Sequence, residues 1–151
     1  TEDGRRTPTA TAERPLSLNP DTQVDADWLL AHLQDADLRL WDARSMEEFS
    51  GERAYATRAG HIPGAIHFEW TRLMDLQHGL RLKPLDRLRD DLATCGLDAR
   101  HPIVTYCQTH HRSSLAWFAG RLLNFNSRAY PGSWAEWGDR TDTPCEKSDH
   151  D

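Results

Sequence analysis

The segment that decides the fold is Tyr106-Cys107-Gln108-Thr109-His110-His111-Arg112-Ser113-Ser114. Before it, residues 102–106 form a short apolar and β-branched run that begins with proline, which predicts a buried strand. After it, residues 113–124 carry apolar side chains at helical spacing, which predicts a helix. A loop between a strand end and a helix start directs backbone N–H groups into one concavity, where anions bind and thiols become more acidic.

Cys107 is the candidate nucleophile of residues 107–112, called here the Cys107 loop. An ordinary thiol has a pKa of about 8.5, and lowering it by about two units takes roughly 2.7 kcal/mol in favour of the thiolate. A helix N-terminus supplies up to about 2 kcal/mol in a partly buried site, and Arg112 with the loop amides can supply the rest. We therefore expect a reactive thiolate at Cys107; the alternative is an inert, buried cysteine at a strand end.

The residues of the Cys107 loop and their spacing bear on three possible chemistries: sulfur transfer, phosphate hydrolysis and zinc binding. Four residues lie between Cys107 and Arg112, one fewer than in the Cys-X5-Arg loop of cysteine-dependent phosphatases. A smaller loop suits a sulfur atom better than the three oxygens of a phosphoryl group. A zinc site of Cys107, His110 and His111 is another alternative, but zinc needs four ligands in a tetrahedral array. We expect no metal and no cofactor.

Together with the Cys107 loop, three other segments give the chain a resemblance to the rhodanese family of sulfurtransferases. In order, they are Asp42-Ala43-Arg44 with Glu47-Glu48-Phe49, then Gly60-His61-Ile62-Pro63-Gly64-Ala65-Ile66, then Tyr130-Pro131-Gly132-Ser133-Trp134-Ala135-Glu136-Trp137. The resemblance covers about residues 22–146, and the joint occurrence of the segments is specific although each alone is weak. Many members of that family have glycine at the position of His110.

The resemblance implies a thiosulfate sulfurtransferase that works by a ping-pong mechanism through a persulfide on Cys107. The donor is a small sulfur-containing anion such as thiosulfate, and the acceptor is cyanide or a thiol. Arg112 and loop N–H groups are expected to stabilise the donor, the leaving sulfite and the persulfide. The other expected substrate-binding residues are Gln108, Thr109, His110, His111, Ser113 and Trp70.

Asp42 and Arg44 are expected to support the site. Asp42 could orient Arg44 or the Cys107 loop; the alternative is a salt bridge or helix cap. Trp70 could equally be a core residue. For the whole chain, the alternative function is a non-catalytic sulfur-relay or regulatory module that docks a partner protein.

Composition limits the remaining classes. The 151 residues suit one domain, and 38% hydrophobic residues suffice for one core. A net charge of -6 gives no electrostatic footprint for nucleic acid. No apolar run is long enough for a membrane span and no signal peptide opens the chain, so the expected location is cytoplasmic. Three cysteines without close spacing predict no disulfide framework.

Three regions are expected along the chain. Residues 1–20 are rich in threonine, proline and charge and predict a linker or disordered arm. Residues 21–140 are the rhodanese-like catalytic domain, and residues 141–151 are a polar tail that we expect to fray, with an exposed Cys145. The arm resembles the linker that joins tandem rhodaneses, and the rest resembles their catalytic second half, so a second rhodanese-like domain is an expected partner.

Strands alternating with helices predict the fold class, an α/β domain of three layers around a mostly parallel sheet. Ligands of such sheets lie beyond the carboxyl ends of the strands, which places Asp42, Trp70 and Cys107 near one rim. His61, Trp134 and Trp137 are expected to be structural, and Cys95 a small core residue. The expected helices are residues 25–34, 45–50, 85–95, 113–124 and 133–137, and the expected strands are residues 38–41, 65–68, 102–106 and 128–130.

Overall fold

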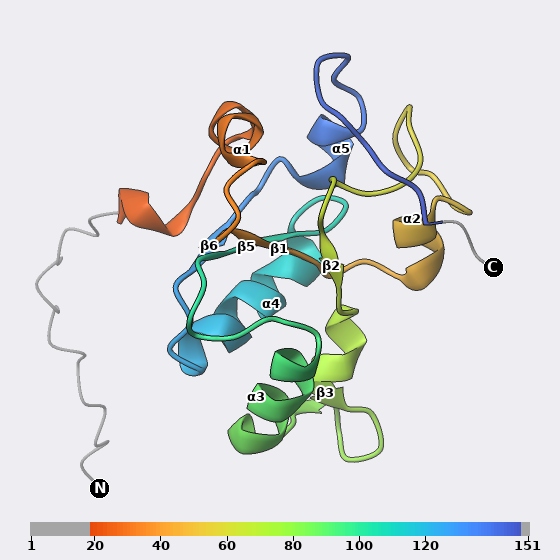
Figure 1. Cartoon of the computed structure of the whole chain (residues 1–151). Coiled ribbons are helices and arrows are strands. Elements are labelled where there is room, and N and C mark those ends of the chain that lie inside the picture. Colours follow the sequence, from red (N-terminus) through yellow and green to blue (C-terminus); the bar gives the residue numbers. More distant parts are fainter. Residues whose placement is uncertain (1–18, 149–151) are drawn as a thin grey trace, which may run out of the picture.

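A four-stranded parallel sheet forms the centre of the domain in the computed structural model, which describes residues 19–148 (Figure 1). Residues 1–18 of the expected arm lie outside the described residues. The strands run in the order β2-β1-β5-β6. Their bounds are β1 Arg39–Asp42, β2 Ile66–His67, β5 Ile103–Tyr106 and β6 Ser127–Ala129.

Helices cover both faces of the sheet, as Figure 1 shows with α1 and α5 above it and α4 and α3 below it. Side chains alternate along β5, so that Ile103 belongs to one apolar core and Val104 to the other. Both central strands, β1 and β5, are almost fully buried. The predicted three-layer α/β fold is thus confirmed. The helices are α1 Ala26–His32, α2 Met46–Ser50, α3 Leu85–Thr94, α4 His111–Leu122 and α5 Ser133–Trp137.

Local capping signals set the starts of two helices, α1 and α2, which were predicted at residues 25–34 and 45–50. Oδ1 of Asp25 accepts from the N–H of Trp28 at 2.8 Å and caps α1. Ser45 and Glu48 form a capping box at the start of α2, and Gly51 ends that helix at a φ of 92°. The predicted burial of Trp134 and Trp137 is confirmed as well.

Four short elements were not predicted from the sequence. They are the 3-10 helices η1 (Pro20–Thr22) and η2 (Trp70–Leu73) and the antiparallel pair β3 (Met74–Asp75) with β4 (Arg81–Leu82). Elements of two to four residues carry too few side chains to show a period. No helix within residues 19–148 is both long and apolar enough to cross a membrane.

The expectation of a frayed tail is wrong for the described part of the C-terminal segment. The backbones of His61 and Glu146 exchange two hydrogen bonds, of 2.8 and 2.9 Å. Arg58 donates to the carbonyls of Trp137 and Arg140 at 2.7 and 2.6 Å, and also to the carbonyl of Thr143. Cys145 is partly buried and packs against the core, so its expected exposure is also wrong. These contacts hold residues 138–146 against the domain, because the segment's own backbone carbonyls accept from a side chain of a distant loop.

Candidate active site

Cys107 directly follows the carboxyl end of β5 and is 1% exposed. Its N–H donates to Oγ of Ser133 at 3.2 Å, and its carbonyl accepts from the N–H of Trp134 at 2.9 Å. The carbonyl of Gln108 accepts from Ala135 in the same way, also at 2.9 Å. The start of α5 therefore fixes the backbone on which the thiol is carried.

The N-terminus of α4 faces the Cys107 loop, because His110 lies immediately before the helix. His110 has a φ of 69°, in the left-handed region that favours glycine. This conformation fits the family's glycine at that position, and it lets α4 begin at His111, two residues earlier than predicted. Nδ1 of His110 lies 2.8 Å from Oγ of the fully buried Ser113. Burial and the neighbouring His111 lower the pKa of His110.

Arg112 is not a free cation beside the thiol, because both of its terminal nitrogens bind Glu48. Nη1 lies 2.6 Å from Oε2, and Nη2 lies 2.8 Å from Oε1. The Glu48 side chain is 4% exposed and that of Arg112 is 25% exposed. Burial acts to raise the pKa of Glu48, but the hydrogen bonds and charge of Arg112 outweigh it and leave that pKa below its ordinary value. The same bonds raise the pKa of Arg112, and the charge of Cys107 contributes to that rise.

Asp42 and Arg44 form a second pair, which is closed off from solvent. The guanidinium of Arg44 donates to both carboxylate oxygens of Asp42 and to the carbonyl of Gly60. It also lies over the ring of Trp134, at 4.8 Å from the centroid. Of the alternatives for Asp42, the structure shows the salt bridge, and it also shows that Asp42 orients Arg44.

The remaining expected residues are spread around the loop. Thr109 and His111 are exposed, whereas Trp70 is partly buried and packs against the core cluster that contains Cys107. Nε2 of Gln108 donates to the carbonyl of Tyr55 at 3.3 Å. Oε1 of Gln108 is buried without a hydrogen-bond partner among residues 19–148. The common location of the site is the rim formed by the carboxyl ends of β1 and β5, where Asp42 is paired with Tyr106 in register.

Two residues of the site, Glu48 and Ser133, were not predicted as site residues from the sequence. The sequence placed Glu48 only within an expected short helix, residues 45–50, and Ser133 only at the start of another, residues 133–137. No local pattern gives either role, because Glu48 and Arg112 are 64 residues apart and Cys107 and Ser133 are 26 apart. The one available signal was that each lies within a segment of the family resemblance.

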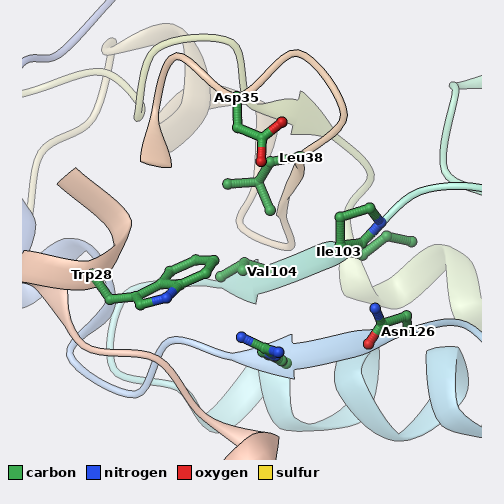
Figure 2. A pocket seen from close by; sticks show the side chains of 8 residues that line it. Trp28, Asp35, Leu38, Ile103, Val104 and Asn126 are labelled. Carbon is green, nitrogen blue, oxygen red and sulfur yellow. The ribbon is translucent and has the colours of Figure 1, made fainter. Parts of the chain in front are cut away.

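Two cavities of about 200 Å³ lie elsewhere on the domain. In Figure 2, Trp28, Leu38 and Val104 face the first, which also includes Ile103. Ile103 begins β5 whereas Cys107 follows its end, so this cavity is at the wrong end of the sheet for the thiol. The second cavity, between α4 and residues 22–23, is lined by His110. His110, a residue of the Cys107 loop, thus also lines that cavity.

A parallel α/β sheet with a cysteine loop between a central strand and a helix N-terminus defines the class of domain. Residues 25–140 match the model of the rhodanese-like domain family, and the chain belongs to that family. The predicted family membership is confirmed.

Curated relatives carry the name thiosulfate sulfurtransferase. The protein of that name from Azotobacter vinelandii is 44% identical over 132 residues, which are 87% of this chain and 48% of the relative. The one from Pseudomonas aeruginosa is 39% identical over 133 residues, again 87% of this chain and 48% of the relative. The chain spans about half the length of these curated relatives.

Solved structures with the same fold include an ergothioneine biosynthesis enzyme. An anaerobic ergothioneine biosynthesis enzyme from Chlorobium limicola, in complex with trimethyl histidine, matches with a TM-score of 0.79 and 30% identity, covering 87% of this chain and 33% of that one. A variant of EanB with a cysteine persulfide and ergothioneine matches with a TM-score of 0.81 and 28% identity, covering 99% and 37%.

Proposed function

We propose that this chain is the sulfur-transferring domain of a thiosulfate sulfurtransferase and that Cys107 carries the sulfur. The observation that supports this most directly is the position of Cys107, between the end of β5 and the N-terminus of the twelve-residue helix α4. Loop amides and the helix dipole favour an anion there. The curated relatives that bear the enzyme's name support the choice of donor.

The reaction has two half-steps, each a displacement at sulfur. The Cys107 thiolate attacks the outer sulfur of thiosulfate, a new S–S bond forms, and the old S–S bond breaks with its electron pair leaving on sulfite. Cyanide or a thiolate then attacks the outer sulfur of the persulfide, which returns Cys107 to the thiolate. The two half-steps use no metal and no cofactor.

The surrounding groups stabilise charge in both half-steps. Loop N–H groups and the N–H groups of Arg112 bind the donor's oxygens and the departing sulfite. Gln108, Thr109, His110, His111 and Ser113 shape the same space, and Trp70 forms a wall beside it. Asp42 and Arg44 act through the backbone at the end of β1, because their side chains bind each other.

A second rhodanese-like domain is the proposed partner, since the curated relatives are about twice as long as this chain. An apolar side chain beside the Cys107 loop is uncovered: Tyr55, whose carbonyl accepts from Gln108, is 62% exposed, and Met46 at the start of α2 is 45% exposed. Such a surface is typical of a docking face.

Mass spectrometry of the intact protein tests the proposed chemistry. After incubation with thiosulfate and removal of excess reagent, the mass should rise by one sulfur atom. Cys107→Ser should abolish the gain, while Cys95→Ser and Cys145→Ser, the matched controls, should retain it. A gain that persists in Cys107→Ser would move the nucleophile elsewhere. No gain, combined with no turnover of thiosulfate and cyanide, would favour the non-catalytic relay or docking module.

A further inference from the structure

We propose that Glu48 is the positioning residue of the site: it holds the guanidinium of Arg112 in one plane so that its remaining N–H groups meet an anionic donor at Cys107. This inference rests on the proposed function and assigns a role to a residue of α2, outside the Cys107 loop. The two side chains meet through two bonds, of 2.6 and 2.8 Å, one to each carboxylate oxygen. A two-pronged contact of this kind fixes both the place and the tilt of a guanidinium.

Glu48 is itself fixed by the fold. Its backbone N–H donates to Oγ of Ser45, and its Oε2 accepts from the N–H of Ser45 at 3.2 Å. The short link before Ser45 is bound to the neighbouring strand, because the N–H of Ala43 donates to the carbonyl of Tyr106 at 3.0 Å. The carboxylate therefore has a set position relative to the strand end from which Cys107 emerges.

Arg112 has donors left over after binding Glu48. A guanidinium carries five N–H groups, and the pair with Glu48 uses two of them, which leaves three. These three have no hydrogen-bond partner within residues 19–148. The Arg112 side chain is 25% exposed, so a small ligand can reach part of it. An oxygen of thiosulfate or sulfite is the kind of acceptor that suits these N–H groups.

The pairing also changes how the arginine acts. Glu48 cancels the net charge of Arg112, and Asp42 cancels that of Arg44. The site is therefore expected to select an anion through directed N–H groups and the N-terminus of α4 rather than through an excess of positive side chains. In such a site the direction of the N–H groups matters more than the net charge. Moving the carboxylate by one methylene should therefore weaken anion binding even though no charge is lost.

Glu48→Asp tests this without changing the charge of the site, and the exposed neighbour offers a matched control in Glu47→Asp. The readout is the ratio of the Cys107 alkylation rates by iodoacetate, an anion, and iodoacetamide, its neutral counterpart. We expect Glu48→Asp to lower that ratio about fivefold and Glu47→Asp to leave it unchanged. We expect kcat/KM for thiosulfate to fall about tenfold in Glu48→Asp, with a smaller loss for dimethyl trisulfide, a neutral donor.

A double-mutant comparison separates positioning from general loosening. In an Arg112→Ala background, Glu48→Asp should cause no further fall in the ratio, because there is no guanidinium left to position. An unchanged ratio in folded Glu48→Asp, or an equal fall with and without Arg112, would overturn the proposal. If Glu48→Asp does not fold, Arg112→Lys is the second variant: it keeps the charge but cannot be held at two points, and an unchanged ratio would again overturn the proposal.

The alkylation ratio does not depend on sulfur transfer. A wild-type protein that forms no persulfide but shows the Glu48-dependent ratio would contradict the proposed function and uphold the role of Glu48. A protein that forms the persulfide but whose ratio does not depend on Glu48 would support the proposed function and contradict the role of Glu48.

Discussion

Nη2 of Arg44 lies 2.6 Å from Oδ2 of Asp42, and the two side chains are 1% and 0% exposed. The pair spans only two residues of sequence, yet it joins the end of β1 to the ring of Trp134 in α5 and to the carbonyl of Gly60. Three segments of the family resemblance thus meet at one guanidinium. The Asp42–Arg44 pair therefore links these three segments at the carboxyl end of β1.

Replacing Asp42 should therefore lower the stability of the protein more than its activity. Asp42→Ala leaves a buried, unpaired guanidinium, and we expect a loss of about 3–5 kcal/mol in the free energy of unfolding. Urea denaturation followed by tryptophan fluorescence would measure it. Turnover of thiosulfate per folded molecule should change about twofold or less. A stable but inactive variant would mean that Asp42 acts on the Cys107 loop directly.

His110 carries backbone strain that glycine would relieve. His110→Gly and His110→Ala both lose the contact with Ser113, but only alanine retains a Cβ at a φ of 69°. We expect the glycine variant to be about 1 kcal/mol more stable than the alanine variant, although glycine is the more flexible residue when unfolded. Thermal melts of the two proteins, compared directly, are sufficient. Equal melting temperatures would contradict this, and would show that the loop of the alanine variant adopts another conformation that relieves the strain.

Acid should remove the contribution of the Glu48–Arg112 pair. The pKa of Glu48 is lower in the folded protein than its value of about 4.3 in an unfolded chain, so the pair's contribution is present above about pH 4.3 and is lost as pH falls through the folded pKa. The difference in unfolding free energy between wild type and Glu48→Gln should shrink over that range. In an Arg112→Met background this pH dependence should disappear or reverse, because burial, which raises the pKa of Glu48, is then no longer outweighed by Arg112.

The length of the Cys107 loop predicts what the site rejects. We expect no meaningful hydrolysis of aryl phosphates, because the loop is one residue shorter than the loop of cysteine-dependent phosphatases. Inserting one glycine between Cys107 and Arg112 should give some such activity. Phosphatase turnover by the wild type that disappears in Cys107→Ser would contradict the sulfurtransferase proposal.

The uncovered side chains predict an effect of a second domain. Adding the remaining half of the Azotobacter vinelandii relative should lower the KM for thiosulfate, and the chain alone should tend to self-associate in sedimentation experiments. Tyr55→Ser should weaken both effects, whereas Leu80→Ser, at the similarly exposed turn between β3 and β4, should not. A strictly monomeric chain whose KM ignores the added half would contradict the docking face.

The part of the fold that could be predicted from the sequence is the part encoded locally. Asp25, Ser45 and Gly51 mark helix ends by their own hydrogen bonds or dihedral angles, and the apolar run of β5 shows a buried strand without help from distant residues. Cys107 could be placed for the same reason, since strand, loop and helix follow one another.

The partners of the site could not be predicted in that way. Glu48 reaches Arg112, and Ser133 reaches Cys107, only after the strands have been brought side by side. From the sequence, Arg112 therefore looked like a free cation and Asp42 had two alternative roles. The C-terminal tail was expected to fray for the same reason. Residues 138–146 are held through their own backbone carbonyls, and a carbonyl accepts a hydrogen bond whatever side chain the residue carries.

The contacts of Arg58 extend the packed domain past the end of the family-model match. The family match ends at residue 140, but Thr143 accepts from Arg58, the carbonyl of Pro144 accepts from Nε1 of Trp137 at 2.7 Å, and Glu146 pairs with His61. Trimming the domain at residue 140 would strip a buried tryptophan and a guanidinium of acceptors at the same time. A domain cut at the end of the family-model match should therefore melt at a lower temperature and aggregate more readily than the same domain extended to residue 148.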